Sequence, residues 1–200
     1  MQKNTGYLEQ ATPTGPFRTL IIVLVLISIL SQVPVTQARE PAWNYSQPDG
    51  EIGGLAISPK GDLIVAGAGK VLFFSRDGTL LAQEPFGSDV RMTEDGKYTA
   101  SVYSSTIYYF ENPLPSGSPD QQKVIKLWDF ELSEQVSSFD MNRDGSLIAG
   151  QTLGKNMFAL NTKTRLARGN TKVADSVIKI SGGSIIGISS GKIHTYSVSG

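Results

Sequence analysis

Few residues in this chain could do chemistry. The 200-residue sequence contains one histidine, His194, and no cysteine, which removes thiol catalysis, cysteine-ligated zinc and iron–sulfur clusters. His194 lies in the segment KIHTYS, which alternates as a strand does, and no partner triad can be named for it. We therefore predict a half-buried structural histidine and expect no catalytic residue, no metal site and no bound cofactor.

Three aspartates, Asp77, Asp95 and Asp144, recur beside turn glycines. Their recurrence favours shared turn chemistry, because an aspartate side chain accepts hydrogen bonds from nearby backbone N–H groups. A calcium loop would need several oxygen ligands at alternating positions, and Arg76-Asp77-Gly78 offers one. We therefore expect these aspartates to shape turns and not to hold calcium.

Other sites are weakly indicated. Paired carboxylates for glycoside hydrolysis cannot be assigned. Gly67-Ala68-Gly69-Lys70 is expected to be a β-turn and not a phosphate-binding loop, because it opens no helix. Six aromatic residues could form a platform for a carbohydrate or a quinone, but we expect them to pack between sheets. They are Trp43, Trp128, Tyr103, Tyr108, Tyr109 and Phe110.

Composition limits the partners. Lys and Arg together number 18, and so do Asp and Glu, so there is no basic field to hold a nucleic-acid backbone. We expect no nucleic-acid partner. The length suits one ordinary domain, and without disulfides its core must hold the fold unaided.

The N-terminal segment is hydrophobic. Leu20–Leu30 reads LIIVLVLISIL, with Arg18 before it and small residues up to Ala38 after it. This pattern predicts a signal peptide over residues 1–38, or a retained signal anchor whose hydrophobic part covers residues 19–35. In both cases the membrane is a partner of this segment, and the rest of the chain lies outside the cell membrane.

An exported domain carries one possible glycosylation site. Asn44-Tyr45-Ser46 matches the acceptor triplet, with Asn44 as the modified residue. Such triplets are also common by chance.

From residue 52 onward the chain repeats one pattern four times: a short strand, a turn, a strand, a tight turn and a third strand. The repeat is about 40 residues long, which is the length of a β-propeller blade. A polar insertion over 113–122 lengthens the second copy. Asp-Gly between apolar runs marks hairpins, because glycine accepts the positive φ of tight turns. The turn glycines are Gly61, Gly96, Gly145 and Gly183.

The repeat predicts an all-β fold: a β-propeller-like array of about four four-stranded blades over 41–200, after an N-terminal hydrophobic helix. A β-sandwich is the alternative, but a sandwich gives no reason for a fourfold repeat. Small residues in the first two strands of each copy fit crowded strands near a propeller axis. They are Gly53, Gly54, Ala56, Ala66, Gly67, Ala149, Gly150 and Gly187.

The segment IGGLAISPKGDLIVAGAGKVLFFSRDGTLL resembles the repeat of WD40-like and PQQ-like (quinoprotein-type) β-propellers. It is particularly similar to tandem-repeat surface proteins of methanogenic archaea, in which a W-x-Y strand precedes the "ISPDG" strand. Trp43-Asn44-Tyr45 and Trp128-Asp129-Phe130 hold that place here. Trp128-Asp129 begins a repeat where a WD dipeptide would end a third strand. The Gly-His pair of WD40 repeats and the tryptophan-docking signature of quinoprotein dehydrogenases are missing.

The resemblance implies a fold and says little about activity. We expect an exported or membrane-anchored, non-catalytic propeller that acts as a binding or scaffold module for an unknown protein or glycan ligand. The alternative is a quinoprotein-like dehydrogenase or another propeller enzyme. An enzyme would need convergent polar residues at the axial mouth, whereas the inner strands here are expected to supply small and apolar residues.

Two accounts of the array's ends stay open. Trp43–Ser46 could pair with Lys192–Ser197 and close four blades into a ring, which would leave no long strand edge bare. Alternatively, the array is part of a longer ring.

Overall fold

The structure is a computed structural model, and the described residues belong to one compact unit, Ala42–Gly200. The predicted signal segment 1–38 lies outside the described residues. Within the described part of the chain, no helix is long and apolar enough to cross a membrane. The described residues are 42–46, 51–118, 121–172, 179–181, 184–189 and 192–197.

Fifteen strands form four antiparallel sheets over these residues. The first sheet contains β1 (Gly54–Ile57), β2 (Leu63–Gly67), β3 (Gly69–Ser75) and β4 (Leu80–Gly87). The second contains β5 (Asp89–Met92), β6 (Tyr98–Tyr103), β7 (Thr106–Glu111) and β8 (Ile125–Glu131). The third contains β9 (Val136–Met141), β10 (Leu147–Thr152), β11 (Asn156–Asn161) and β12 (Ala167–Lys172). The fourth contains β13 (Lys179–Ser181), β14 (Ser184–Ser189) and β15 (Lys192–Ser197).

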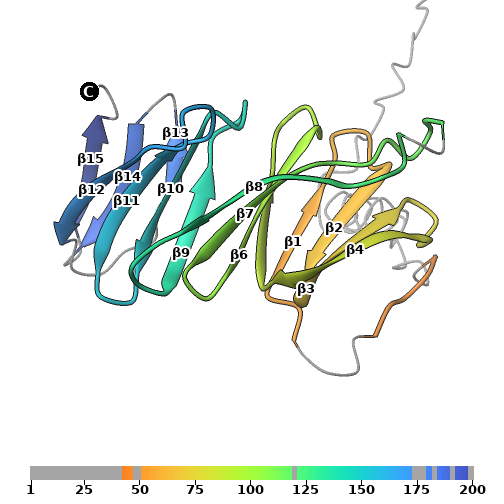
Figure 1. The fold of residues 1–200 in the computed structure, drawn as a ribbon, viewed down its shortest axis with the longest axis horizontal. Helices are drawn as coiled ribbons and strands as arrows, with labels where there is room; N and C mark the ends of the chain where they lie inside the picture. Colours follow the sequence, from red (N-terminus) through yellow and green to blue (C-terminus); the bar gives the residue numbers. More distant parts are fainter. Residues whose placement is uncertain are drawn as a thin grey trace, which may run out of the picture. The chain divides into compact units, whose positions relative to one another are not determined.

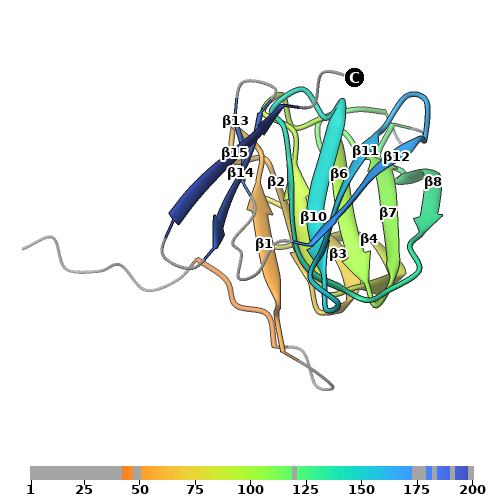
Figure 2. The same cartoon turned by 90° about the vertical axis from the view of Figure 1, so that its left-hand side faces the viewer.

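The four sheets stand side by side in chain order, as Figure 1 shows for the unit Ala42–Gly200. The first strand of each sheet contacts the first strand of the next, from β1 to β5, β9 and β13. Figure 2 shows the same sheets from the end that carries β13, β14 and β15. The predicted all-β array of four blades is confirmed, with three strands described in the fourth sheet.

Apolar side chains fill the spaces between neighbouring sheets. Val65, Val71 and Phe73 of the first sheet pack against Val90 and Phe110 of the second, and all five are at most 1 % exposed. A larger cluster joins the second and third sheets, and Ala149, Met157 and Ile185 join the third and fourth. Strands with both faces covered read as near-continuous apolar runs, which is the pattern of β2 and β10.

The turn glycines adopt the conformation that the sequence predicted. Gly61, Gly96 and Gly145 have φ of 65°, 73° and 71°, in the left-handed region where a Cβ is disfavoured. Gly183 lies outside the described residues. Close approach explains another glycine: a Cβ on Gly67 would lie 2.7 Å from the carbonyl oxygen of Ser88, the residue before β5. Position 67 therefore has no room for a side chain where the first sheet meets the second.

A polar residue opens each of the first three turns. Ser58, Thr93 and Asn142 each accept a hydrogen bond, through a side-chain oxygen, from the backbone N–H five residues later. The donor–acceptor distances are 3.0, 2.9 and 2.9 Å. This repeated bond holds the start of the second strand and was not predicted from the sequence.

The segment 42–46 does not lie where ring closure within one chain would place it. The Trp43 ring lies 5.6 Å from the Phe74 ring, and Trp43 Nε1 donates a hydrogen bond of 3.0 Å to the Arg76 carbonyl oxygen. In the described residues β15 pairs with β14 alone. Of the two accounts left open for the array's ends, the pairing of Trp43–Ser46 with Lys192–Ser197 is not present in the described residues, because Phe74 and the Arg76 carbonyl hold the tryptophan on the first sheet.

Candidate functional site

The three turn aspartates share one arrangement. Asp95 accepts hydrogen bonds from the Thr93 hydroxyl at 2.6 Å and from the Lys97 N–H at 2.9 Å. Asp144 accepts them from the N–H and the hydroxyl of Ser146, and Asp77 from Ser75 and Thr79. The predicted turn role is confirmed. Among the described residues no group of three or more His, Cys, Asp or Glu side chains could hold a metal ion.

These hydrogen bonds favour the charged carboxylates. The Thr93 hydroxyl, followed by the Lys97 N–H, lowers the pKa of Asp95 below its ordinary value. The Ser75 hydroxyl lowers the pKa of Asp77, and the Ser146 N–H lowers that of Asp144. A carboxylate with a lowered folded pKa adds stability above its unfolded pKa, and that stability is lost as the pH falls through the folded value.

We expect the free energy of unfolding to be insensitive to these groups between about pH 7 and 5 and to decrease below about pH 4. Urea unfolding across this range measures the decrease. The matched variant carries Asp77→Asn, Asp95→Asn and Asp144→Asn, and should lose less stability on acidification than the wild type. Equal acid losses in the two proteins would show that other groups cause the acid sensitivity.

The single histidine lies in a strand beside an aromatic ring. His194 on β15 is half-buried, and its ring lies 6.3 Å from the Tyr196 ring at an interplanar angle of 26°. Its Cα partner in the sheet is Gly187. The half-buried position predicted for His194 is confirmed.

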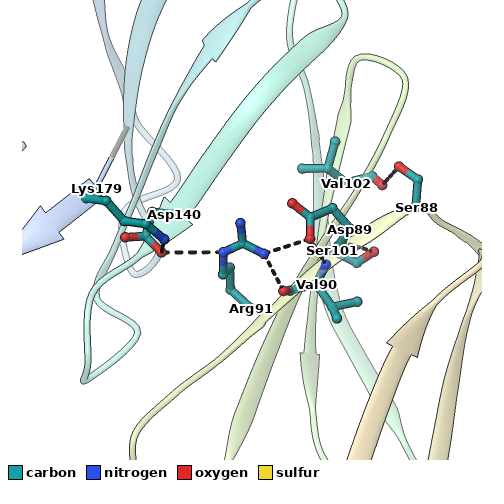
Figure 3. Close-up of polar contacts among 8 residues, drawn as sticks. All are labelled: Ser88, Asp89, Val90, Arg91, Ser101, Val102, Asp140 and Lys179. Atoms are coloured by element: carbon teal, nitrogen blue, oxygen red, sulfur yellow. Dashed lines mark hydrogen bonds and ion pairs between the residues drawn. The ribbon is translucent and has the colours of Figure 1, made fainter. Parts of the chain in front are cut away.

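The first strands of three consecutive sheets bring four charged residues together (Figure 3). We call Asp89 and Arg91 of β5, Asp140 of β9 and Lys179 of β13 the first-strand cluster. Arg91 Nη1 lies 2.6 Å from Asp89 Oδ1, and Arg91 Nε lies 3.5 Å from Asp140 Oδ1. Lys179 Nζ lies 3.8 Å from the same Asp140 oxygen. From the sequence, we expected the inner strands to supply small and apolar residues. The first strands β5, β9 and β13 also carry charged residues, so that expectation is wrong.

The first-strand cluster is internally satisfied. Asp140 Oδ2 accepts a hydrogen bond of 3.0 Å from the Ile180 N–H, and the Arg91 guanidinium lies 5.0 Å from the centre of the Phe139 ring. Two carboxylates and two cations balance each other. Each charged group lies within 4.0 Å of an opposite charge, so the cluster ties three sheets together. A sequence signal existed: Arg91 and Asp140 hold the same repeat position with opposite charges.

Replacing Asp140 with alanine should lower the free energy of unfolding by about 1–3 kcal/mol. The change leaves Arg91 and Lys179 without their shared carboxylate and the Ile180 N–H without its acceptor, and the Asp140 side chain is only 13 % exposed. Urea unfolding measures the loss. The control is Glu94→Ala, which removes an exposed ion pair and should cost less than about 0.5 kcal/mol. Equal effects would mean that Asp140 does not tie the sheets.

Side chains of two neighbouring sheets form a groove on the surface. Phe86 comes from β4, Tyr108 from β7, and Lys126 and Asp129 from β8. The Phe86 and Tyr108 rings are stacked with centres 6.2 Å apart, and Tyr103 lies 5.4 Å from Phe86. The cavity has a volume of about 260 Å³. Its lining, which we call the aromatic groove, consists of Glu84, Pro85, Phe86, Tyr108, Phe110, Lys126 and Asp129.

The polar side of the aromatic groove is an ion pair. Lys126 Nζ lies 2.8 Å from Asp129 Oδ2 and 5.9 Å from the centre of the Tyr108 ring. Asp129 raises the pKa of Lys126, so the ammonium group stays charged. The groove therefore offers stacked rings beside one cation and two carboxylates, those of Glu84 and Asp129.

The predicted packing of the aromatic residues between sheets is confirmed for Trp128, Tyr109, Phe110 and Tyr108. Trp128 stacks on Tyr109 with ring centres 4.9 Å apart, and both are buried, as is Phe110. Tyr103 is 42 % exposed and lies beside the aromatic groove, which Tyr108 lines, and both rings contact Phe86 of the first sheet. Phe86 was not predicted, since one aromatic residue after Pro85 carries no periodic signal.

Asn44 is exposed, next to the half-buried Trp43. Glycosylation at Asn44 stays a prediction.

No protein-family model matches this chain, and no curated protein does. Solved structures are similar. The β-propeller domain of Cps50 (Swd1) from Myceliophteria thermophila is 17 % identical with a TM-score of 0.65, covering 75 % of this chain and 55 % of that one. The computationally designed Ika4 protein is 10 % identical with a TM-score of 0.62, covering 80 % and 99 %. The RRP9 WD40 repeats are 15 % identical with a TM-score of 0.53, covering 76 % and 52 %.

The chain thus spans about half the length of the Swd1 and RRP9 chains. Likeness at this identity concerns the fold alone, because one fold hosts many functions. The protein has a β-propeller fold similar to that of WD40 domains.

Proposed function

We propose that this protein is a non-catalytic propeller, exported or anchored in the membrane, that binds a partner protein through the aromatic groove. The observation that carries the proposal is the half-exposed Phe86, 46 % exposed, stacked on Tyr108 beside the Lys126–Asp129 ion pair. Partly exposed aromatic side chains with a polar rim are typical of binding surfaces.

The size of the aromatic groove favours a protein partner. Small-molecule sites usually have volumes of about 300–1,000 Å³, and this groove has about 260 Å³. It would accept one or two anchoring side chains. An apolar or aromatic anchor would stack on Phe86 and Tyr108, and a neighbouring basic residue would meet Glu84 and Asp129.

The first-strand cluster supports binding over catalysis. A quinoprotein-like dehydrogenase or another propeller enzyme would need free polar groups that converge on a substrate. In the described residues, Arg91 and Asp140 instead form ion pairs with each other and with Asp89 and Lys179. Adding calcium and pyrroloquinoline quinone to the protein should therefore give no stoichiometric uptake. Tight uptake, seen in absorbance and as a thermal shift, would favour the enzyme.

Export rests on the segment Leu20–Leu30, with Arg18 before it and Ala38 after it. In its host the protein should fractionate with membranes or medium, and external protease should digest the domain in intact cells. Protease resistance in intact cells, with the bulk of the protein in the soluble cytoplasmic fraction, would contradict export.

Binding can be tested with a displayed peptide library selected on the full chain. Selected peptides should carry an aromatic or aliphatic anchor, and Phe86→Ala should weaken their binding at least tenfold, the loss expected of an interface anchor. The control Leu153→Ala removes a side chain of similar exposure, 62 %, outside the groove. Equal binding by both variants would place the peptide site elsewhere. Enrichment on a glycan array with the same Phe86 dependence would favour a sugar ligand instead.

A further inference from the structure

The first sheet leaves apolar residues exposed on part of one face, and Trp43 and Tyr45 pack on Phe74 in another part of that face. Leu55 and Ile57 are 58 % and 57 % exposed, and the strand register places them opposite Ala66 and Ile64 on the same face. Leu80, which is 45 % exposed, lies opposite Phe74. This face points away from the second sheet, against which Val65 and Phe73 pack. We call Leu55, Ile57, Ile64, Ala66, Phe74 and Leu80 the leading face. Ala66 and Phe74 are buried, with Trp43 packed against them, so the uncovered part of the leading face consists of Leu55, Ile57 and Leu80.

The repeat shows what normally covers such residues. In the second sheet, Val90 holds the position of Leu55 and is 0 % exposed, because the first sheet covers it. In the third sheet, Phe139 holds the same position and is 2 % exposed under the second sheet. The uncovered part of the leading face, Leu55, Ile57 and Leu80, therefore has the chemistry of a blade interface and is exposed.

The fourth sheet leaves the complementary face uncovered. Ile185 and Tyr196 pack toward the third sheet. Ile188 and Ile193, paired with each other in the register, point the other way and are 45 % and 74 % exposed. We call Ile186, Ile188 and Ile193 the trailing face. In the described residues β15 is also an edge strand, and exposed apolar edges are usually covered.

We infer that a second copy of this chain covers both faces. The leading face and the trailing face are the two halves of the interface that recurs between sheets within the chain, so the trailing face of one copy fits the leading face of another.

The geometry of the pair follows from these contacts. Each copy places its trailing face on the other's leading face, so two equal head-to-tail contacts close a ring about a twofold axis. The chain has a formal net charge of zero, so two copies meet without net repulsion. This inference is independent of the aromatic groove, whose lining residues belong to neither face.

Sedimentation velocity of the full chain in a density-matched detergent tests the inference. We expect a dimer with twice the chain mass of 21.5 kDa. Ile57→Glu and Ile193→Glu should each weaken dimerisation at least tenfold, because each puts a charge into both contacts of the ring. Both positions are exposed, so circular dichroism should stay unchanged. The control Leu153→Glu adds the same charge at an exposed position outside both faces and should dimerise as the wild type does.

Mixing distinguishes a head-to-tail ring from other dimers. A pair made of one Ile57→Glu copy and one Ile193→Glu copy has one unmodified contact, so the mixture should dimerise more tightly than either variant alone. A monomer at all concentrations, or a dimer that only one of the two substitutions affects, would overturn the inference.

Discussion

Replacing Trp128 with alanine is expected to lower the free energy of unfolding by about 3–5 kcal/mol. Trp128 is 8 % exposed and stacks on Tyr109, which stacks on Tyr98 and donates a hydrogen bond to the Gly145 carbonyl oxygen. The substitution therefore opens a cavity in the cluster that joins the second and third sheets. A domain has a total stability of about 5–15 kcal/mol, so the loss should be large enough to unfold much of the protein in mild urea.

Urea unfolding of the full chain measures this loss. Trp128→Phe keeps a ring against Tyr109 and should cost clearly less than Trp128→Ala. A change below about 0.5 kcal/mol for Trp128→Ala, the range of surface substitutions, would contradict packing of the second sheet against the third.

Phe73→Ala should destabilise the protein by a similar amount, about 3–5 kcal/mol. Phe73 is 0 % exposed, and its ring meets the Phe110 ring edge-on at 6.0 Å across the first and second sheets. The neighbouring residue provides a control of the same type: Phe74 points to the leading face, where Trp43 and Tyr45 pack on it.

Double-mutant cycles with Val90→Ala distinguish the packing role of Phe73 from that of Phe74. The Val90→Ala change, which trims the second-sheet side of the same cluster, should cost less in the Phe73→Ala background than in the wild type, because the two sites share a cavity. The same Val90→Ala change should cost the same with and without Phe74→Ala. Additive losses in both pairs would show that Phe73 does not reach the second sheet.

The strands and turns could be predicted from sequence because they depend on local chemistry. A glycine with positive φ, such as Gly96 or Gly145, marks a turn, and the apolar runs on either side of it are strands. The same local reasoning assigned Asp95 and Asp144 to turn hydrogen bonds.

The role of a tryptophan could not be predicted in this way. Trp43 and Trp128 have similar neighbours in sequence, yet Trp128 lies in β8 on Tyr109, whereas Trp43 lies on Phe74 of the first sheet. The position of each tryptophan depends on which sheet offers an apolar surface and, for Trp43, a carbonyl oxygen that accepts its hydrogen bond. The spacing of residues in the sequence reveals neither of these.

The candidate sites could not be predicted because they span sheets. Phe86, Tyr108 and Lys126 belong to strands that the sequence separates, and only sheet packing brings them into one groove. Arg91 and Asp140 likewise meet because successive first strands are neighbours. Sequence periodicity locates the strands, but it does not show which side chains from different sheets come together when the sheets pack.

The central claim is that the aromatic groove binds a partner protein. It is tested most directly by placing a photo-crosslinking amino acid at Phe86 of the full chain in its host. A second protein carries the same amino acid at Leu153, which has similar exposure outside the groove. We predict one dominant protein adduct from position 86 that is absent from position 153 and is lost when Tyr108→Ala is added. Equal adducts from the two positions, or an adduct that persists in the Tyr108→Ala protein, would contradict the account.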